Sequence, residues 1–245
     1  MAEARTYRAQ MNQAHLVSFR TVVQETDLMI QADRELAGVS RDLALRYRGH
    51  IENYIARYGE FARTLVPWPA SGPMPVIIQE MVAAARQVGV GPMAAVAGAV
   101  AQQVGQGLLA QSREVVVENG GDLFIKLEKP ATVGIYAGDS PLSMRVGVKI
   151  DSRARPVAVC TSSGTLGHSL SLGVADAATV IADSCSLADA AATAIGNRVD
   201  SPAAVESAIE FGQTIGGIQG LVVICGETIG AWGAVDLEPL GGKKG

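Results

Sequence analysis

The sequence is poor in aromatic side chains and in the residues that build metal clusters or disulfide frameworks. Its 245 residues include four phenylalanines, two tryptophans, three histidines and three cysteines. The cysteines Cys160, Cys185 and Cys225 are widely spaced and form no C-x-x-C pair. Neither a disulfide framework nor a zinc site is expected, and this cysteine usage fits a reducing compartment.

Long apolar runs and basic runs are also missing. The longest apolar stretch, residues 88–101, is shorter than the roughly 20 residues that a membrane-spanning helix needs. The first residues, MAEARTYRAQMNQ, are polar and have no apolar core of the kind found in signal peptides. A net charge of −4 gives no general reason to bind nucleic acid or an anionic membrane. We therefore predict a soluble, cytoplasmic protein.

What the chain does contain is small and apolar residues. It has 28 glycines, and 48% of its residues are hydrophobic while 18% are charged. A chain of this length and composition can bury a large core, as one domain or as two intimately packed subdomains. Close backbone approaches should matter more than aromatic packing, and the small apolar surface is compatible with a homodimer.

Residue periodicity predicts an α+β fold. A period of three and four predicts an amphipathic helix over residues 33–65, broken near Gly38 or Gly59. The segment from Pro67 to Pro73 cannot continue a helix, and we take residues 67–75 as the best internal boundary, with strands of one sheet on both sides of it. Further helices are expected over 75–88, from Pro92 onward and over 202–215. Strands are expected over 6–11, 16–23, 28–32, 132–137, 145–150, 156–160, 177–182, 221–225 and 228–232, and residues 241–245 should fray.

The segment 186–194, SLADAAATA, is typical of a helix start. Ser186 followed three residues later by Asp189 matches a capping box, in which the acid bonds back to the helix terminus. Asp189 and Thr193 are four residues apart, so both oxygens project from one helix face and could hold Mg²⁺ next to a pyrophosphate. The alternative is that Asp189 only completes the cap while Thr193 packs.

Two other segments are rich in groups that could face a ligand. Thr161, Ser162, Ser163 and Gly164 precede His168 in a loop after an apolar strand, where N–H and O–H donors can surround an anion or a heteroaromatic ring. A surface turn has the same composition, and His168 has no Ser–His–Asp partner by spacing.

The third segment is Asn119-Gly120-Gly121-Asp122, which separates two apolar β segments. A tight hairpin explains this pattern. A functional interpretation explains it equally well, because paired glycines can bring bare backbone N–H groups against a ligand.

Taken together, these three segments resemble, in order and approximate spacing, the motifs of the ApbE superfamily, whose best-known members are FAD:protein FMN transferases. The likeness covers roughly residues 92–196 and is greatest to a cytoplasmic, uncharacterised branch. The resemblance implies an α+β fold of two related, intimately packed subdomains with mixed or antiparallel sheets flanked by helices, and a ligand between the subdomains.

The resemblance also implies a ligand and roles for individual residues. It implies FAD as the small-molecule nucleotide ligand, with Asp189 and Thr193 binding Mg²⁺. It places residues 119–122 and 161–164, together with Gly98, beside the flavin nucleotide. His168 could polarise a phosphate or hydroxyl as the catalytic residue, although a structural role for it fits as well. The family reaction splits the FAD pyrophosphate and moves FMN to a threonine of an acceptor flavoprotein, releasing AMP.

The sequence departs from the transferases in one aligned segment. They carry an acid and a Lys-Gly pair where this chain has Gly91 and Ala97-Gly98, so both charges are missing while the glycine is kept. Losing the cation removes phosphate binding. The lipoprotein signal of the transferases is not seen either, so we expect no periplasmic acceptor. Three hypotheses stay open: a Mg²⁺-dependent transferase or pyrophosphatase acting on FAD, a non-catalytic binding or assembly module, and an enzyme for another phosphorylated metabolite.

Overall fold

The computed structural model describes residues 13–69, 72–164 and 172–241. The strand predicted over residues 6–11 and the C-terminal tail from residue 242 lie outside the described residues. The helices are α1 (Ala37–Arg57), α2 (Val76–Val88), α3 (Val96–Leu108), α4 (Cys185–Gly196) and α5 (Val205–Gln213), with short 3-10 turns at Gly59–Ala62, Pro92–Ala95 and Pro202–Ala204.

Eight strands form the central sheet, in the order β1-β2-β3-β4-β7-β8-β9-β10, and every neighbouring pair is antiparallel. Their bounds are β1 (Val17–Val23), β2 (Thr26–Ala32), β3 (Val115–Asn119), β4 (Asp122–Lys126), β7 (Val157–Ser162), β8 (Ala177–Ala182), β9 (Ile218–Cys225) and β10 (Thr228–Gly233). The sheet takes strands from both sides of the proline-rich segment, as the sequence predicted.

The sheet consists of two topologically similar halves. In the first, helices α1 to α3 lie in the chain between the hairpins β1-β2 and β3-β4. In the second, α4 and α5 lie between β7-β8 and β9-β10. The halves join where β4 pairs with β7, with Asp122 opposite Cys160. This arrangement agrees with two related, intimately packed subdomains.

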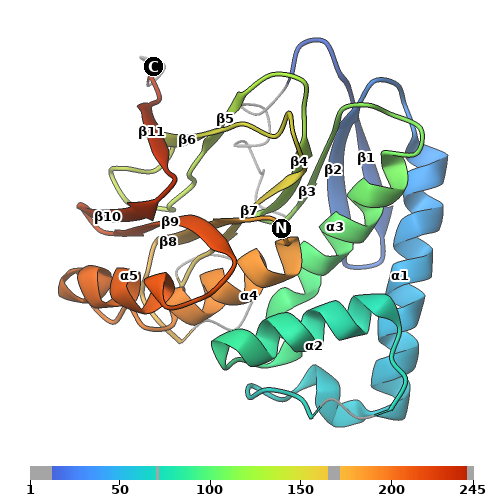
Figure 1. Ribbon diagram of the computed structural model, residues 1–245, viewed down its shortest axis with the longest axis horizontal. Helices are drawn as coiled ribbons and strands as arrows, with labels where there is room; N and C mark the ends of the chain where they lie inside the picture. The colour runs from blue at the N-terminus through green and yellow to red at the C-terminus, as the bar shows by residue number, and fades with distance from the viewer. Residues whose placement is uncertain (1–12, 70–71, 165–171, 242–245) are drawn as a thin grey trace.

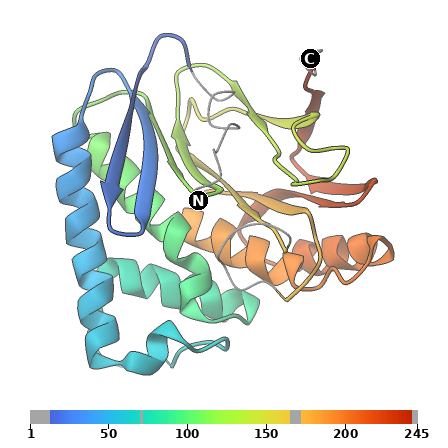
Figure 2. The ribbon, with the colours of Figure 1, turned by 180° about the vertical axis from the view of Figure 1, so that it is seen from behind.

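The molecule has three layers (Figure 1). The helices cover one face of the large sheet, and a small antiparallel sheet of order β11-β6-β5 covers part of the other face, as the reverse view also shows (Figure 2). Its strands are β5 (Ala131–Gly134), β6 (Val146–Ile150) and β11 (Asp236–Pro239). The central strands are apolar on both faces: in β7, Ala158 and Cys160 belong to the helix-side core while Val157 and Val159 belong to the other.

Two predictions about the strands need correction. The segments 132–137 and 145–150, predicted as strands alongside those of the large sheet, overlap β5 and β6, which pair in the small sheet, and residues 135–137 are not in a strand. Strand β11 was not predicted at all, because Asp236, Glu238 and Pro239 are unusual strand residues. They are tolerated at this edge, where β11 pairs only with β6.

The predicted helices are largely confirmed. The long first helix ends at Arg57, just before Gly59, and begins at Ala37. No single helix among the described residues is long and apolar enough to cross a membrane, and only the pair Val76–Val88 and Pro92–Leu108, bent by 109°, meets the length and composition criteria together.

Candidate functional site

The site is built around a close contact between α3 and α4. The backbone N–H of Gly98 donates a hydrogen bond to Asp189 Oδ2 at 2.8 Å. A Cβ on Gly98 would lie 2.3 Å from the carbonyl oxygen of Cys185 and 2.8 Å from the Cβ of Asp189. Only glycine therefore allows the two helices to approach closely enough for this hydrogen bond.

The capping box predicted for α4 is wrong. The N-cap is Ser184, whose side chain accepts a hydrogen bond from the Leu187 N–H, so Ser186 lies inside the first turn. A capping box needs Glu or Gln at the third helical position, and Leu187 occupies it here. The Asp189 carboxylate is thus not used by its own helix terminus. It faces α3 instead, where it accepts the hydrogen bond from Gly98.

The turn between β3 and β4 lies against the same contact. Asn119 Nδ2 donates to the carbonyl oxygen of Ala97 at 3.0 Å, next to Gly98. Gly120 has a φ of +78°, which favours glycine, and a Cβ on Gly121 would lie 2.8 Å from the Thr161 carbonyl oxygen. The turn is a hairpin, as one interpretation predicted, and it also contacts α3 and β7.

Two carboxyl groups, Asp122 from β4 and Asp189 from α4, lie near enough to each other here to interact electrostatically. Asp122 is buried, and its Oδ1 has no hydrogen-bond partner. Burial, the nearby Asp189 and, more weakly, Glu118 raise the pKa of Asp122 well above its usual range. Burial also raises the pKa of Asp189 to about 7, against the opposing effect of the Gly98 and Ala97 N–H groups. Without a cation nearby, ionising both carboxyl groups costs free energy, because two negative charges would then lie close together in a buried site.

The hydroxyl-rich segment continues from the end of β7. Thr161 Oγ1 is hydrogen-bonded to Thr179 Oγ1 at 2.9 Å, so this hydroxyl joins two strands. Ser162 ends β7, and its Oγ lies 3.9 Å from where a Cβ of Gly196 would be, at the C-terminal end of α4. Ser163 and Gly164 follow, and the Gly164 N–H donates to the Ala175 carbonyl oxygen at 2.8 Å. His168 lies outside the described residues.

Thr193 lies one turn beyond Asp189 on α4 and is partly exposed. The structure thus brings together at the β4–β7 junction four segments: the start of α3, the turn 119–122, the end of β7 and one face of α4. No group of three or more His, Cys, Asp or Glu side chains capable of holding a metal occurs within the described ranges. A cation here would therefore have few protein ligands, which is the mode that Mg²⁺ tolerates because it keeps several waters.

Sequence reasoning missed the residues that fix this contact from α3. Gln102 Oε1 accepts a hydrogen bond from the Cys185 N–H at 2.7 Å, and Ala97 offers its backbone to the site. The detectable signal was a pair of consecutive glutamines, Gln102 and Gln103, in a largely apolar helix; both side chains are buried.

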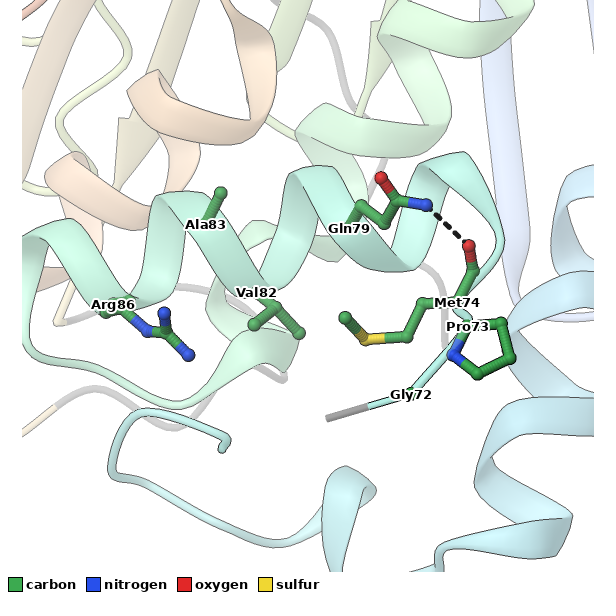
Figure 3. Close-up of a pocket in the computed structure, with 7 residues that line it drawn as sticks. All are labelled: Gly72, Pro73, Met74, Gln79, Val82, Ala83 and Arg86. Carbon is green, nitrogen blue, oxygen red and sulfur yellow. Dashed lines mark hydrogen bonds between the residues drawn. The ribbon is translucent and has the colours of Figure 1, made fainter. Parts of the chain in front are cut away.

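A cavity of about 420 Å³ lies elsewhere, between α2 and the loop before it (Figure 3). Gln79, Val82, Ala83 and Arg86 line it from the helix, opposite residues 72–74. None of the predicted site residues is among its seven lining residues. We therefore locate the candidate site at the carboxyl pair Asp122 and Asp189 and not at this cavity.

The two related halves and the helix layer on one face of the sheet define an ApbE-like α+β fold. The structure is similar to the apo crystal structure of the flavinyl transferase ApbE of Pseudomonas stutzeri, with a TM-score of 0.61 and 15% identity, covering 89% of this chain and 94% of that one. It is also similar to the ApbE protein of Thermotoga maritima, with a TM-score of 0.51 and 14% identity, covering 88% and 96%. At this level of identity the likeness concerns the fold.

The sequence itself belongs to the family described as AbpE bacteria, whose model matches residues 8–228. Its relatives include the UPF0280 protein of Methanocella arvoryzae, which is 41% identical over 86% of both chains. Another is the UPF0280 protein of Methanopyrus kandleri, also 41% identical, covering 89% of this chain and 91% of the relative.

Proposed function

We propose that this protein binds FAD together with Mg²⁺ at the junction of its two halves. The observation that carries the proposal is the Asp189 carboxylate, which is turned away from its own helix terminus and held by the Gly98 N–H beside the buried Asp122. The fold shared with a flavinyl transferase of Pseudomonas stutzeri supports flavin as the ligand class.

The residues present fit a hard divalent cation. Asp189 and Thr193 would hold it from one face of α4, since carboxylate and hydroxyl oxygens are the ligands that Mg²⁺ prefers. The partnerless Oδ1 of Asp122 supports this assignment, because a cation nearby would offset the cost of a buried, ionised carboxyl. Mg²⁺, when bound, would polarise phosphoryl oxygens of a pyrophosphate.

The chain's own glycines would bring backbone close to the nucleotide. Gly121 and Gly98 each lie where a Cβ would collide with a neighbouring backbone oxygen, so the segments around the site pack against each other without intervening side chains. Residues 119–122 and 161–164 would then line the ligand, although the N–H groups of Gly121, Thr161 and Gly164 already donate to backbone carbonyl oxygens. Thr161 would contribute no donor, because its N–H donates to the Gly121 carbonyl oxygen and its hydroxyl is hydrogen-bonded to Thr179.

A second candidate, binding without transfer, is favoured by the segment that lacks the charges of the transferases. A Cβ on Gly91 would lie 1.9 Å from the Thr64 carbonyl oxygen, so this backbone position cannot carry an acidic side chain. Ala97 stands in place of the lysine and offers no cation to a phosphate. If FMN transfer does occur, its acceptor would be a flavoprotein that this site has to receive.

The test is a titration of the purified protein with FAD, with and without Mg²⁺, by flavin fluorescence and with parallel assays of AMP and FMN. We expect Mg²⁺-dependent binding in the wild type and its loss in Asp189→Asn, which keeps the size of the side chain. Asp183→Asn is the control, because Asp183 is an exposed acid on the surface before α4. AMP release would establish pyrophosphate chemistry, and binding without it would establish the second candidate. Absence of FAD binding would overturn the proposal.

A further inference from the structure

Helices α3 and α4 are joined by two hydrogen bonds, one turn apart on each helix. Gly98 N–H donates to Asp189, and Cys185 N–H donates to Gln102 Oε1 at 2.7 Å. Residues 98 and 102 are four apart on α3, as are 189 and 185 on α4, so the two bonds are separated by about 6 Å along each helix. Because the order reverses between the helices, the pairs fix one antiparallel register.

The Gln102 bond replaces one that the helix cannot make for itself. Cys185 is the first residue of α4, and the first N–H groups of any helix lack a partner within it. Cys185 and Gln102 are both buried, so water does not supply the missing acceptor. Gln102 is therefore the acceptor that holds the start of α4 against α3.

The Gln102 amide is itself oriented from a third helix. Its Nε2 donates to Glu80 Oε2 at 3.3 Å, while Gln103 Nε2 donates to both oxygens of Glu80 at 2.9 and 2.8 Å. With its N–H side turned to the Glu80 carboxylate, Gln102 presents its oxygen to α4. Glu80, Gln102 and the Cys185 N–H thus form a chain across α2, α3 and α4.

We propose that Gln102, oriented by Glu80, is a positioning residue that sets the register of α4 and thereby delivers Asp189 to the Gly98 N–H. This inference rests on the proposed function only for its effect on cation binding. Gln102 touches neither the cation oxygens nor the nucleotide segments among the described contacts, so it acts through α4.

Gln103 provides a matched control. It lies next to Gln102 on α3, is equally buried and donates to the same carboxylate, but no described hydrogen bond joins it to α4. Gln102→Leu and Gln103→Leu should therefore both lower thermal stability. Only Gln102→Leu should speed hydrogen exchange of the Gly98 amide, and only it should weaken binding of Mn²⁺, used as the probe in the presence of FAD, by about 10-fold to 100-fold.

Exchanging the donor and acceptor side chains at positions 80 and 102 tests the direction of the hydrogen bonds that link Glu80, Gln102 and the Cys185 N–H. Gln102→Glu alone places two carboxyl groups together and should behave like Gln102→Leu. The double variant Glu80→Gln/Gln102→Glu restores a donor at position 80 and keeps an acceptor for the Cys185 N–H, so Gly98 protection and Mn²⁺ affinity should recover. Recovery in the double variant supports the proposal even if Gln102→Leu folds poorly.

The two proposals can fail separately. Unchanged Gly98 exchange in a folded Gln102→Leu protein, or equal changes in Gln102→Leu and Gln103→Leu, would overturn the positioning role. If the wild type binds neither Mn²⁺ nor FAD, the proposed function fails, while the exchange measurement still decides whether Gln102 positions Asp189.

Discussion

The two halves of the molecule share a topology but contribute different chemistry to the site. The first half contributes mainly bare backbone, through Gly98 and the glycines of the turn 119–122, with Asp122 as its acid. The second half contributes side chains on α4, of which Asp189 and Thr193 share one face. The first half therefore approaches α4 closely at Gly98, where a side chain does not fit, while its Gln102 side chain bonds α4 one turn further along.

This division explains why a chain so poor in aromatic residues can form a specific site. The contact between α3 and α4 is fixed by Gly98 and by polar bonds from Asp189 and Gln102 rather than by large side chains. Helix α4 is accordingly rich in small buried residues, among them Ala188, Ala190 and Ala191. Substitutions should therefore disrupt this contact for different reasons: by steric overlap at Gly98 in the first half, and by loss of a charged side chain at Asp189 in the second half.

The largest effect is expected when a methyl group is added at the helix contact. In Gly98→Ala, the new Cβ would lie 2.3 Å from the Cys185 carbonyl oxygen, so α3 and α4 must separate. The free energy of unfolding should fall by about 3 kcal/mol or more, at or above the upper end of the usual range for overpacking, because backbone atoms cannot rotate away as a flexible side chain can. Chemical denaturation measures the loss, and flavin binding should disappear with it.

Gly49→Ala is the matched control for this substitution. Gly49 lies within α1, and its Cβ would meet nothing within 4 Å. The change should stabilise the protein by up to about 1 kcal/mol, because alanine is the better helix former. Equal stability of the Gly98→Ala and Gly49→Ala proteins would show that the two helices are not in tight contact.

The second prediction concerns the acid of the second half. The pKa of Asp189 is raised from its ordinary 3.8 to about 7, so between these values the folded protein holds a proton that the unfolded chain has lost. Stability should therefore fall as pH rises from about 4 to about 7 and level off above that range. Urea titrations at several pH values should show this slope in the wild type, a weaker one in Asp189→Asn, and a reduced one with Mg²⁺ present.

Asp151 offers a control of opposite sign. Hydrogen bonds from Arg153 lower the pKa of this exposed acid to about 2, so its titration lies below the range in question. Asp151→Asn should leave the slope between pH 4 and 7 unchanged. A slope that is the same in Asp189→Asn as in the wild type would assign the effect to Asp122 or to another group.

Much of the fold was readable from local patterns, whereas the site contacts were not. Alternation predicted the strands 16–23 and 28–32 and the strands 221–225 and 228–232, and each pair forms a hairpin, since register there is set by neighbours in sequence. The bond between Gly98 and Asp189 joins residues 91 apart, and no local pattern encodes it. The same holds for Gln102 and Cys185, which are 83 residues apart.

The error at α4 shows how a local pattern can mislead. Ser184 and Ser186 are both plausible helix caps, and the acid three residues after Ser186 favoured the wrong one. The strand β8 ends at Ala182, which leaves only two residues before α4 and places the cap at Ser184. The position of β8 in the sheet, a tertiary property, thus determined where α4 starts. Asp189 is therefore not part of the helix cap and accepts the hydrogen bond from Gly98 instead.

The smallest effect is expected at the end of β7, where a substitution distinguishes two roles of the Thr161 hydroxyl: pairing of two strands and contact with the ligand. Thr161→Val removes the hydroxyl that bonds Thr179 Oγ1, and Thr179 is buried, so the change should cost about 1–3 kcal/mol of unfolding free energy. The double variant Thr161→Val/Thr179→Val removes both partners and should recover most of that loss. FAD affinity, measured by fluorescence in the same samples, should stay near the wild-type value in both. A loss of affinity that persists in the stable double variant would instead show that the Thr161 hydroxyl reaches the ligand, and the second half would then supply one more side chain to the site.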